Sequence, residues 1–197
     1  MKSSLFRKAL SFATFTFFIL GLSSCSMSVN DKGENEKVDI RTPIGGLHVG
    51  SDVDVKETGL PVYPGSRRKP EEKGKDNNNA SVTIASSMFG IKIAAVTYDS
   101  DDPPEKLVSF YQNELLHYGK VLQCHGKSGN DVKVDIHDLK GKKPKEVSCN
   151  KDDSDSAVVE LKVGTEDNQH LVSIEPHDKG SEFSLVYIQA RGKREPI

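Results

Sequence analysis

The sequence has no tryptophan, only three cysteines and no apolar run long enough to cross a membrane as a helix. Its longest apolar run, residues 9–22, has 14 residues, whereas a spanning helix needs about 20. Hydrophobic residues make up 35% of the 197 residues and aromatic residues 7%, so the core must be modest. The length suits one domain, or one domain with a small appendage.

Neither sign of charge dominates, which argues against a nucleic-acid binder. The 27 basic and 29 acidic residues are interspersed and make up 28% of the chain. A nucleic-acid-binding domain concentrates its basic residues on one face or stretch. The composition instead describes a well-hydrated domain, and no nucleic-acid partner is expected.

The N-terminus has the three parts of a secretory signal. Lys2, Arg7 and Lys8 form a basic head, the apolar run 9–22 follows, and small residues end it. This order predicts a signal peptide over residues 1–24 and therefore an exported protein. The alternative is an N-terminal anchor helix left uncleaved, which the short run disfavours. Cleavage leaves 24 basic and 29 acidic residues, so the formal net charge moves from -2 to -5.

The four residues Leu22-Ser23-Ser24-Cys25 resemble the lipobox of bacterial lipoprotein precursors. The resemblance implies that the Cys25 sulfur receives a diacylglyceryl group, that cleavage occurs just before Cys25, and that the new amine is acylated, for example with palmitate. Two or more acyl chains hold a protein stably on a membrane, so the membrane is an expected partner. Ser26 follows the cysteine instead of an aspartate, which favours the outer membrane, on its periplasmic face or surface, if the host has one.

The two remaining cysteines, Cys124 and Cys149, predict a disulfide, because leftover cysteines in an exported protein usually pair. A closed loop of about 25 residues stabilises by roughly 3 to 3.5 kcal/mol in the chain-entropy model. A metal pair or a reactive thiol are the alternatives. The chain has no C-x-x-C motif, and neither cysteine has a clear helix N-terminus beside it.

The mature chain divides into a tether, a hairpin and a main domain. Residues 25–37 comprise the lipidated cysteine and a polar, flexible tether. Residues 38–57 form a small β-hairpin segment, in which the alternation over 38–49 predicts two strands and Val53 and Val55 a third. Residues 58–197 form an α+β domain.

One helix is predicted over about 103–118. Asp102 is placed to cap it, Pro103 fits the first helical position, and Glu105 completes a capping box. Apolar residues recur at helical spacing and form one stripe, which comprises Leu107, Val108, Tyr111, Leu115 and Tyr118. The stripe is interpreted as core, although an aromatic stripe can also line a ligand groove.

Most other elements read as strands, so the expected fold is an antiparallel β-sheet packed by one main helix. The predicted strands are 80–87, 91–98, 121–124, 132–136, 147–149, 158–163, 171–174 and 183–189. Their connections carry Gly, Pro, Asn and Asp, as hairpins do.

Two stretches, "TGLPVYPGS" and "AAVTYDSDDPPEKLVSFYQNELLHYGK", resemble a domain of unknown function in exported bacterial proteins. The shared pattern is a Tyr-Pro-Gly-[Ala/Ser] turn, a strand, and Asp-Ser-x-x-x-Glu-Lys-[Val/Leu]-x-x-Phe-Tyr-x-x-x-Leu. It covers roughly residues 58–120, and "VDIRTPIGGLHV" resembles a segment that precedes such domains. The resemblance implies fold and location, and it brings no catalytic residues with it.

No motif for catalysis, metal or cofactor binding is present. The chain lacks H-E-x-x-H, a G-x-S-x-G elbow and a phosphate-loop lysine. His125, His137 and Cys149 are the residues that a hydrolase or metal-dependent enzyme would use if the strands brought them together. The preferred interpretation is surface histidines near a disulfide, so no catalytic, metal or cofactor-binding residue is assigned.

The sequence thus predicts a membrane-anchored cell-envelope lipoprotein that acts as a non-catalytic binding or structural module. Basic clusters at 67–69, 140–145 and 191–194 offer contact with an envelope protein or a cell-wall polymer, although acidic neighbours favour solvated loops. The alternatives are the enzyme with a site near His125, His137 and Cys149, and a small-ligand carrier with a groove behind Tyr111 and Tyr118.

Overall fold

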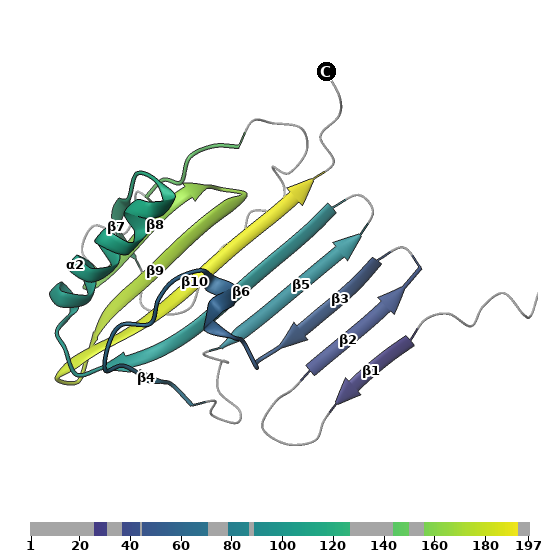
Figure 1. Cartoon of the computed structure of the whole chain (residues 1–197), viewed down its shortest axis with the longest axis horizontal. Coiled ribbons are helices and arrows are strands. Elements are labelled where there is room, and N and C mark those ends of the chain that lie inside the picture. The colour runs from purple at the N-terminus through teal and green to yellow at the C-terminus, as the bar shows by residue number, and fades with distance from the viewer. Residues whose placement is uncertain are drawn as a thin grey trace, which may run out of the picture.

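The computed structural model describes residues 26–30, 37–43, 45–70, 79–86, 89–126, 144–149 and 156–192. In these residues, ten strands form one antiparallel sheet in the order β1-β2-β3-β5-β6-β10-β9-β8-β7, with the short β4 paired to β6 (Figure 1). The strands are β1 (Ser26–Asn30), β2 (Lys37–Thr42), β3 (Gly45–Gly50), β4 (Arg67–Arg68), β5 (Ala80–Ser86), β6 (Phe89–Ser100), β7 (Leu122–Gly126), β8 (Val158–Thr165), β9 (Asn168–His177) and β10 (Gly180–Gly192).

The sheet carries its helix on one face only, over the half formed by the C-terminal strands (Figure 1). The α-helix α2 (Pro104–Leu115) continues into a 3₁₀ turn, η2 (Leu116–Tyr118), and α2 packs against β8 and β9. We call the side of the sheet that α2 covers the helix face and the opposite side the far face. The predicted α+β fold with one helix over about 103–118 is confirmed.

The main core lies between α2 and the helix face. Leu107, Tyr111 and Leu115 are fully buried on the helix, at the spacing that the sequence predicted. The strands contribute alternate residues, because successive side chains in a strand point to opposite faces. The buried strand residues of this core are Ala94, Val96, Tyr98, Leu161, Val163, Val172, Ile174, Phe183 and Leu185.

The N-terminal hairpin is part of the same sheet. β2 pairs with β3 as predicted, and β3 then pairs with β5, which joins the hairpin to the long central strand β6. The segment between β3 and β5 crosses the helix face, where Val53 and Leu60 are buried in the main core.

Four local predictions are wrong. Residues 147–149 form no strand, and beside them only Glu146 makes an isolated bridge, to Thr165. Ser26–Asn30 forms strand β1 instead of a tether, because "SMSVN" alternates small or polar with apolar residues, as a strand requires. The rest of the predicted tether, apart from Lys37 in β2, lies outside the described residues. Val55 begins a 3₁₀ turn, η1 (Val55–Thr58), because the Asp54 side chain accepts from the Lys56 amide. Pro103, not Asp102, occupies the N-cap position of α2, and no side chain makes a capping hydrogen bond there.

Candidate functional site

The predicted disulfide between Cys124 and Cys149 is present, and it takes Cys149 out of the predicted alternative site near His125 and His137. The two Cα atoms are 5.4 Å apart, within the range that a disulfide requires. Cys149 is therefore no free thiolate ligand or nucleophile. The ring of His125 contacts the Ser156 carbonyl through Nδ1 at 3.1 Å, and His137 lies outside the described residues.

The predicted lipidation residue, Cys25, lies outside the described residues, and the first described residue is its neighbour Ser26. β1 starts there and pairs with β2, Ser26 standing opposite Arg41. Among the described helices, none is long and apolar enough to cross a membrane.

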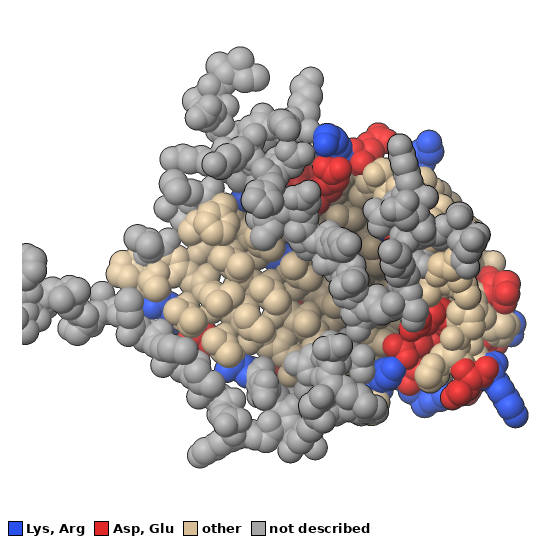
Figure 2. All heavy atoms as spheres, turned by 180° about the vertical axis from the view of Figure 1, so that it is seen from behind, with Lys and Arg blue, Asp and Glu red and all other residues tan. Residues whose placement is uncertain are grey.

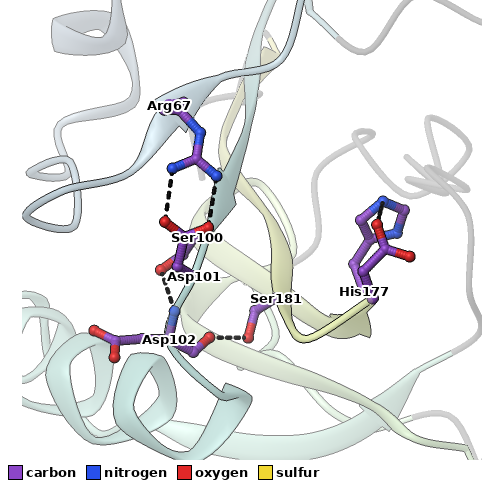
Figure 3. Close-up of polar contacts among 7 residues, drawn as sticks. Arg67, Ser100, Asp101, Asp102, His177 and Ser181 are labelled. Atoms are coloured by element: carbon purple, nitrogen blue, oxygen red, sulfur yellow. Dashed lines mark hydrogen bonds and ion pairs between the residues drawn. The ribbon is translucent and has the colours of Figure 1, made fainter.

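A polar network holds the junction between β6, β10 and the start of α2 (Figure 3). The Arg67 guanidinium donates two hydrogen bonds to the Asp101 carboxylate, at 2.9 and 2.7 Å. The Ser100 hydroxyl accepts from the Asp102 amide at 3.1 Å, and the Ser181 hydroxyl donates to the Asp102 carbonyl at 2.8 Å. These bonds fix the end of β6 against the start of β10 and set the direction in which α2 leaves the sheet.

The Asp102 carboxylate explains why this residue does not cap the helix. It accepts from the Tyr63 hydroxyl at 2.8 Å and from the Lys106 ammonium at 2.6 Å. Hydrogen bonding to Lys106 and then to Tyr63 lowers the pKa of this carboxyl. The Asp102 side chain therefore connects Tyr63, beside the Pro64-Gly65 turn, to the helix. The carboxylate that the sequence predicted as a helix cap is used for these two hydrogen bonds instead.

The best metal-type group in the described residues is formed by Asp99, His177 and Glu182. Each offers one ligand atom, and these atoms lie within 4.8 Å of one another. One carboxylate oxygen of Asp99 is buried and has no hydrogen-bond partner among the described residues. Carboxylate and imidazole ligands suit a transition metal.

Lys69 supplies the positive charge in this cluster. Its side chain is only 24% exposed, and its ammonium pairs with the carboxylate of Glu182, whose side chain is 12% exposed. Burial lowers the pKa of Lys69, but the hydrogen bond and charge of Glu182, together with Asp99 and Glu175, outweigh it and raise the pKa. A divalent cation would have to sit beside this ammonium, so the arrangement favours a structural ion pair over a metal centre.

The tyrosines predicted to line a groove lie in different environments. Tyr111 is fully buried, donates to the Pro61 carbonyl at 3.2 Å and accepts from the Tyr63 amide at 3.0 Å. Burial raises the pKa of Tyr111 far above its ordinary value, which keeps the hydroxyl protonated. Tyr118 is 46% exposed and donates to the Gly59 carbonyl. Tyr111 thus fills the space behind the helix itself, which is against the ligand-carrier alternative.

The part of the sheet formed by β2, β3 and β5 has two chemically different faces. Residues opposite each other in the strand pairs share a face, and the register places Val38, Val49 and Val82 in one row and Ile40, Leu47 and Ile84 in the next. These six half-buried residues, which we call the aliphatic rows, lie on the far face. On β6, Ile93 extends the first row beside Val82, and Ile91 extends the second row beside Ile84. Figure 2, which views the far face, shows a broad area of uncharged atoms there.

The helix face of the same strands is charged. Three lysine or arginine side chains of this face and of the adjoining β6 pair with acids: Lys37 with Asp52 at 3.3 Å, Arg41 with Asp39 at 3.2 Å and Lys92 with Glu57 at 3.1 Å. Hydrogen bonding to Arg41 lowers the pKa of the Asp39 carboxyl. In the described residues, β2 and β3 contact chiefly their neighbouring strands, and α2 packs elsewhere. The part of the sheet formed by β2, β3 and β5 is therefore an amphipathic layer with one charged face and one aliphatic face.

Sequence reasoning found the alternation in β2, β5 and β6 but missed this one-sided surface. The alternation in "KVDIRT" was visible, yet which face α2 would cover depends on strand order. Comparisons of the chain with protein-family models, curated proteins and solved structures found no match. The resemblance to exported domains of unknown function therefore stays a prediction.

Proposed function

We propose that this chain is an exported lipoprotein, anchored to a membrane of the cell envelope through acylated Cys25, whose domain acts as a non-catalytic binding or structural module. The observation that carries the proposal is the lipobox-like Leu22-Ser23-Ser24-Cys25 directly after the apolar run 9–22. The structure is compatible with this motif, because the first described strand, β1, lies after Cys25 in the chain. Cleavage before Cys25 would remove residues 1–24 and leave every described strand in place.

Two further observations support export and a structural role for the charged groups near α2. The Cys124–Cys149 disulfide suits an oxidising compartment outside the cytosol. The charged groups at the start of α2 pair with one another, Arg67 with Asp101 and Lys106 with Asp102, which is the pattern of a structural network. The outer membrane, on its periplasmic face or surface, is the favoured location where the host has one.

Metabolic labelling with a fatty-acid analogue tests the anchor. The parent protein should carry the label and fractionate with membranes, and Cys25→Ser should lose both properties. The double variant Cys124→Ala/Cys149→Ala is the matched control and should keep the label, because its remaining cysteine is Cys25. Labelling that persists in Cys25→Ser would refute the proposal.

A further inference from the structure

We propose that the aliphatic rows of β2, β3 and β5 lie directly on the lipid surface, so that the domain contacts the membrane through its far face as well as through its acyl chains. The inference rests on the anchor at Cys25 proposed above. It adds a protein surface, with named residues, to that anchor.

The first step is the distance between the anchor and the sheet. Ser26 stands opposite Arg41 in the β1–β2 pair, where opposed Cα atoms are about 5 Å apart. Cys25 is one residue further along the chain, about 3.8 Å from Ser26. The acylated residue therefore lies within about 10 Å of β2, and no flexible tether separates β1 from the membrane.

The second step is the orientation that this short connection permits. Acyl chains begin at the headgroup level and enter the hydrocarbon region, so β1 and β2 must lie at the membrane surface. One face of that layer carries the ion pairs of Lys37, Arg41 and Lys92 with their carboxylate partners. Charged pairs are costly to remove from water, which leaves the aliphatic face as the one turned to lipid.

The third step is the chemistry of the face itself. An amphipathic element lies in the membrane interface when one face is aliphatic and the other polar, and it buries its apolar face about 5 to 10 Å deep. The aliphatic rows meet this requirement with the six aliphatic residues named above. Phe89, which follows the same alternation as Ile91 and Ile93 on β6, is 43% exposed at the end of the strand nearest the β5–β6 turn.

The basic residues of this part of the sheet do not supply an electrostatic attraction to the membrane. Each of the three on the helix face is paired with an acid. Binding through the far face should therefore persist when ionic strength rises, whereas binding through a basic patch weakens with screening.

Polarity-sensitive fluorescence on the lipidated protein tests the inference. Ile84→Cys and Thr83→Cys are neighbours in β5 that point to opposite faces. Each variant, labelled with bimane after purification in its lipidated form, is reconstituted into vesicles of phosphatidylethanolamine and phosphatidylglycerol. We expect lipid-borne nitroxide to quench the probe at position 84 several-fold more than at 83, and aqueous iodide to give the reverse order. The pattern should survive added salt.

The outcomes separate this inference from the anchor. Probes at 83 and 84 that are equally open to iodide in a protein carrying the fatty-acid label would refute lipid docking and leave the anchor intact. Loss of the fatty-acid label in the parent protein would refute the anchor itself. Self-quenching at 84 that replaces quenching by lipid nitroxide would assign the face to a second copy of the chain. Val38→Cys provides a second far-face position if Ile84→Cys unfolds the domain.

Discussion

The His170 ring packs at a tilt of 39° against the Tyr118 ring with centroids 3.9 Å apart, and its Nδ1 lies 2.9 Å from the Thr58 carbonyl oxygen. Because a carbonyl only accepts, Nδ1 carries a proton in this bond. Burial lowers the pKa of His170, and the bond to Thr58 only partly opposes this effect. The histidine therefore joins η1, η2 and β9 in its neutral form.

Stability should fall as the pH is lowered through the titration of His170. A group whose folded pKa is depressed contributes fully above its unfolded pKa, about 6.5 for histidine, and its contribution is lost as the pH falls through the folded value. Urea unfolding between about pH 7.5 and about pH 5 measures this slope. His170→Gln should flatten it, and His117→Gln, at an exposed histidine outside this contact, is the control for the substitution itself. Equal slopes in all three proteins would contradict the assignment.

The helix makes a second prediction through two adjacent leucines. Leu115 is fully buried in the main core, and Leu116 is 61% exposed. Leu115→Ala should lower the free energy of unfolding by about 2 to 5 kcal/mol, because it leaves a cavity between helix and sheet. Leu116→Ala should change it by no more than about 0.5 kcal/mol. Denaturant unfolding of both variants checks this, and similar losses would mean that the apolar stripe is placed wrongly.

The helix and most strands could be predicted because their patterns are local. The spacing of Leu107, Tyr111 and Leu115 is that of one helical face, and the alternation from Ile91 to Tyr98 is that of a strand buried on both sides. Short elements were less predictable: Val53 and Val55 alternate like a strand, but the Asp54 side chain turns the chain into a 3₁₀ helix.

The candidate sites could not be predicted because they depend on strand order. Lys69 and Glu182 are 113 residues apart in sequence and meet only because β4 and β10 both pair with β6. The aliphatic rows likewise need β3 beside β5, a pairing that no local pattern specifies. The cysteine pair was the exception, because only two cysteines remain once Cys25 is taken as the lipidation residue, and predicted export favours their pairing.

The Lys69–Glu182 pair leads to a third prediction. Lys69→Met leaves Glu182 and the unpartnered oxygen of Asp99 without a nearby ammonium. Because both charges are partly buried, we expect a loss of about 1 to 3 kcal/mol in the free energy of unfolding. Lys106→Met removes the exposed pair with Asp102 and should cost about 0 to 1 kcal/mol. Thermal or urea unfolding at neutral pH distinguishes the two variants.

The same pair has an alkaline pH dependence. The pKa of Lys69 is raised in the folded protein, so its contribution is complete below the unfolded value of about 10.4 and is lost as the pH rises through the folded value. The difference in stability between parent and Lys69→Met should therefore shrink above about pH 10.4. A difference that stays constant with pH would assign the effect to packing of the lysine stem.

The last prediction concerns the bond between Cys124 on β7 and Cys149, 25 residues later. In the chain-entropy model, a bridge over a loop of this length stabilises the folded state by roughly 3 to 3.5 kcal/mol. Protein purified without reductant should contain no titratable thiol, and reduction should lower the free energy of unfolding by about that amount. Cys124→Ala/Cys149→Ala is the control: its free energy of unfolding should equal that of the reduced parent and should not change when reductant is added. Two reactive thiols in the parent, or a stoichiometric metal protecting them, would contradict the bridge and bring back the site near His125, His137 and Cys149.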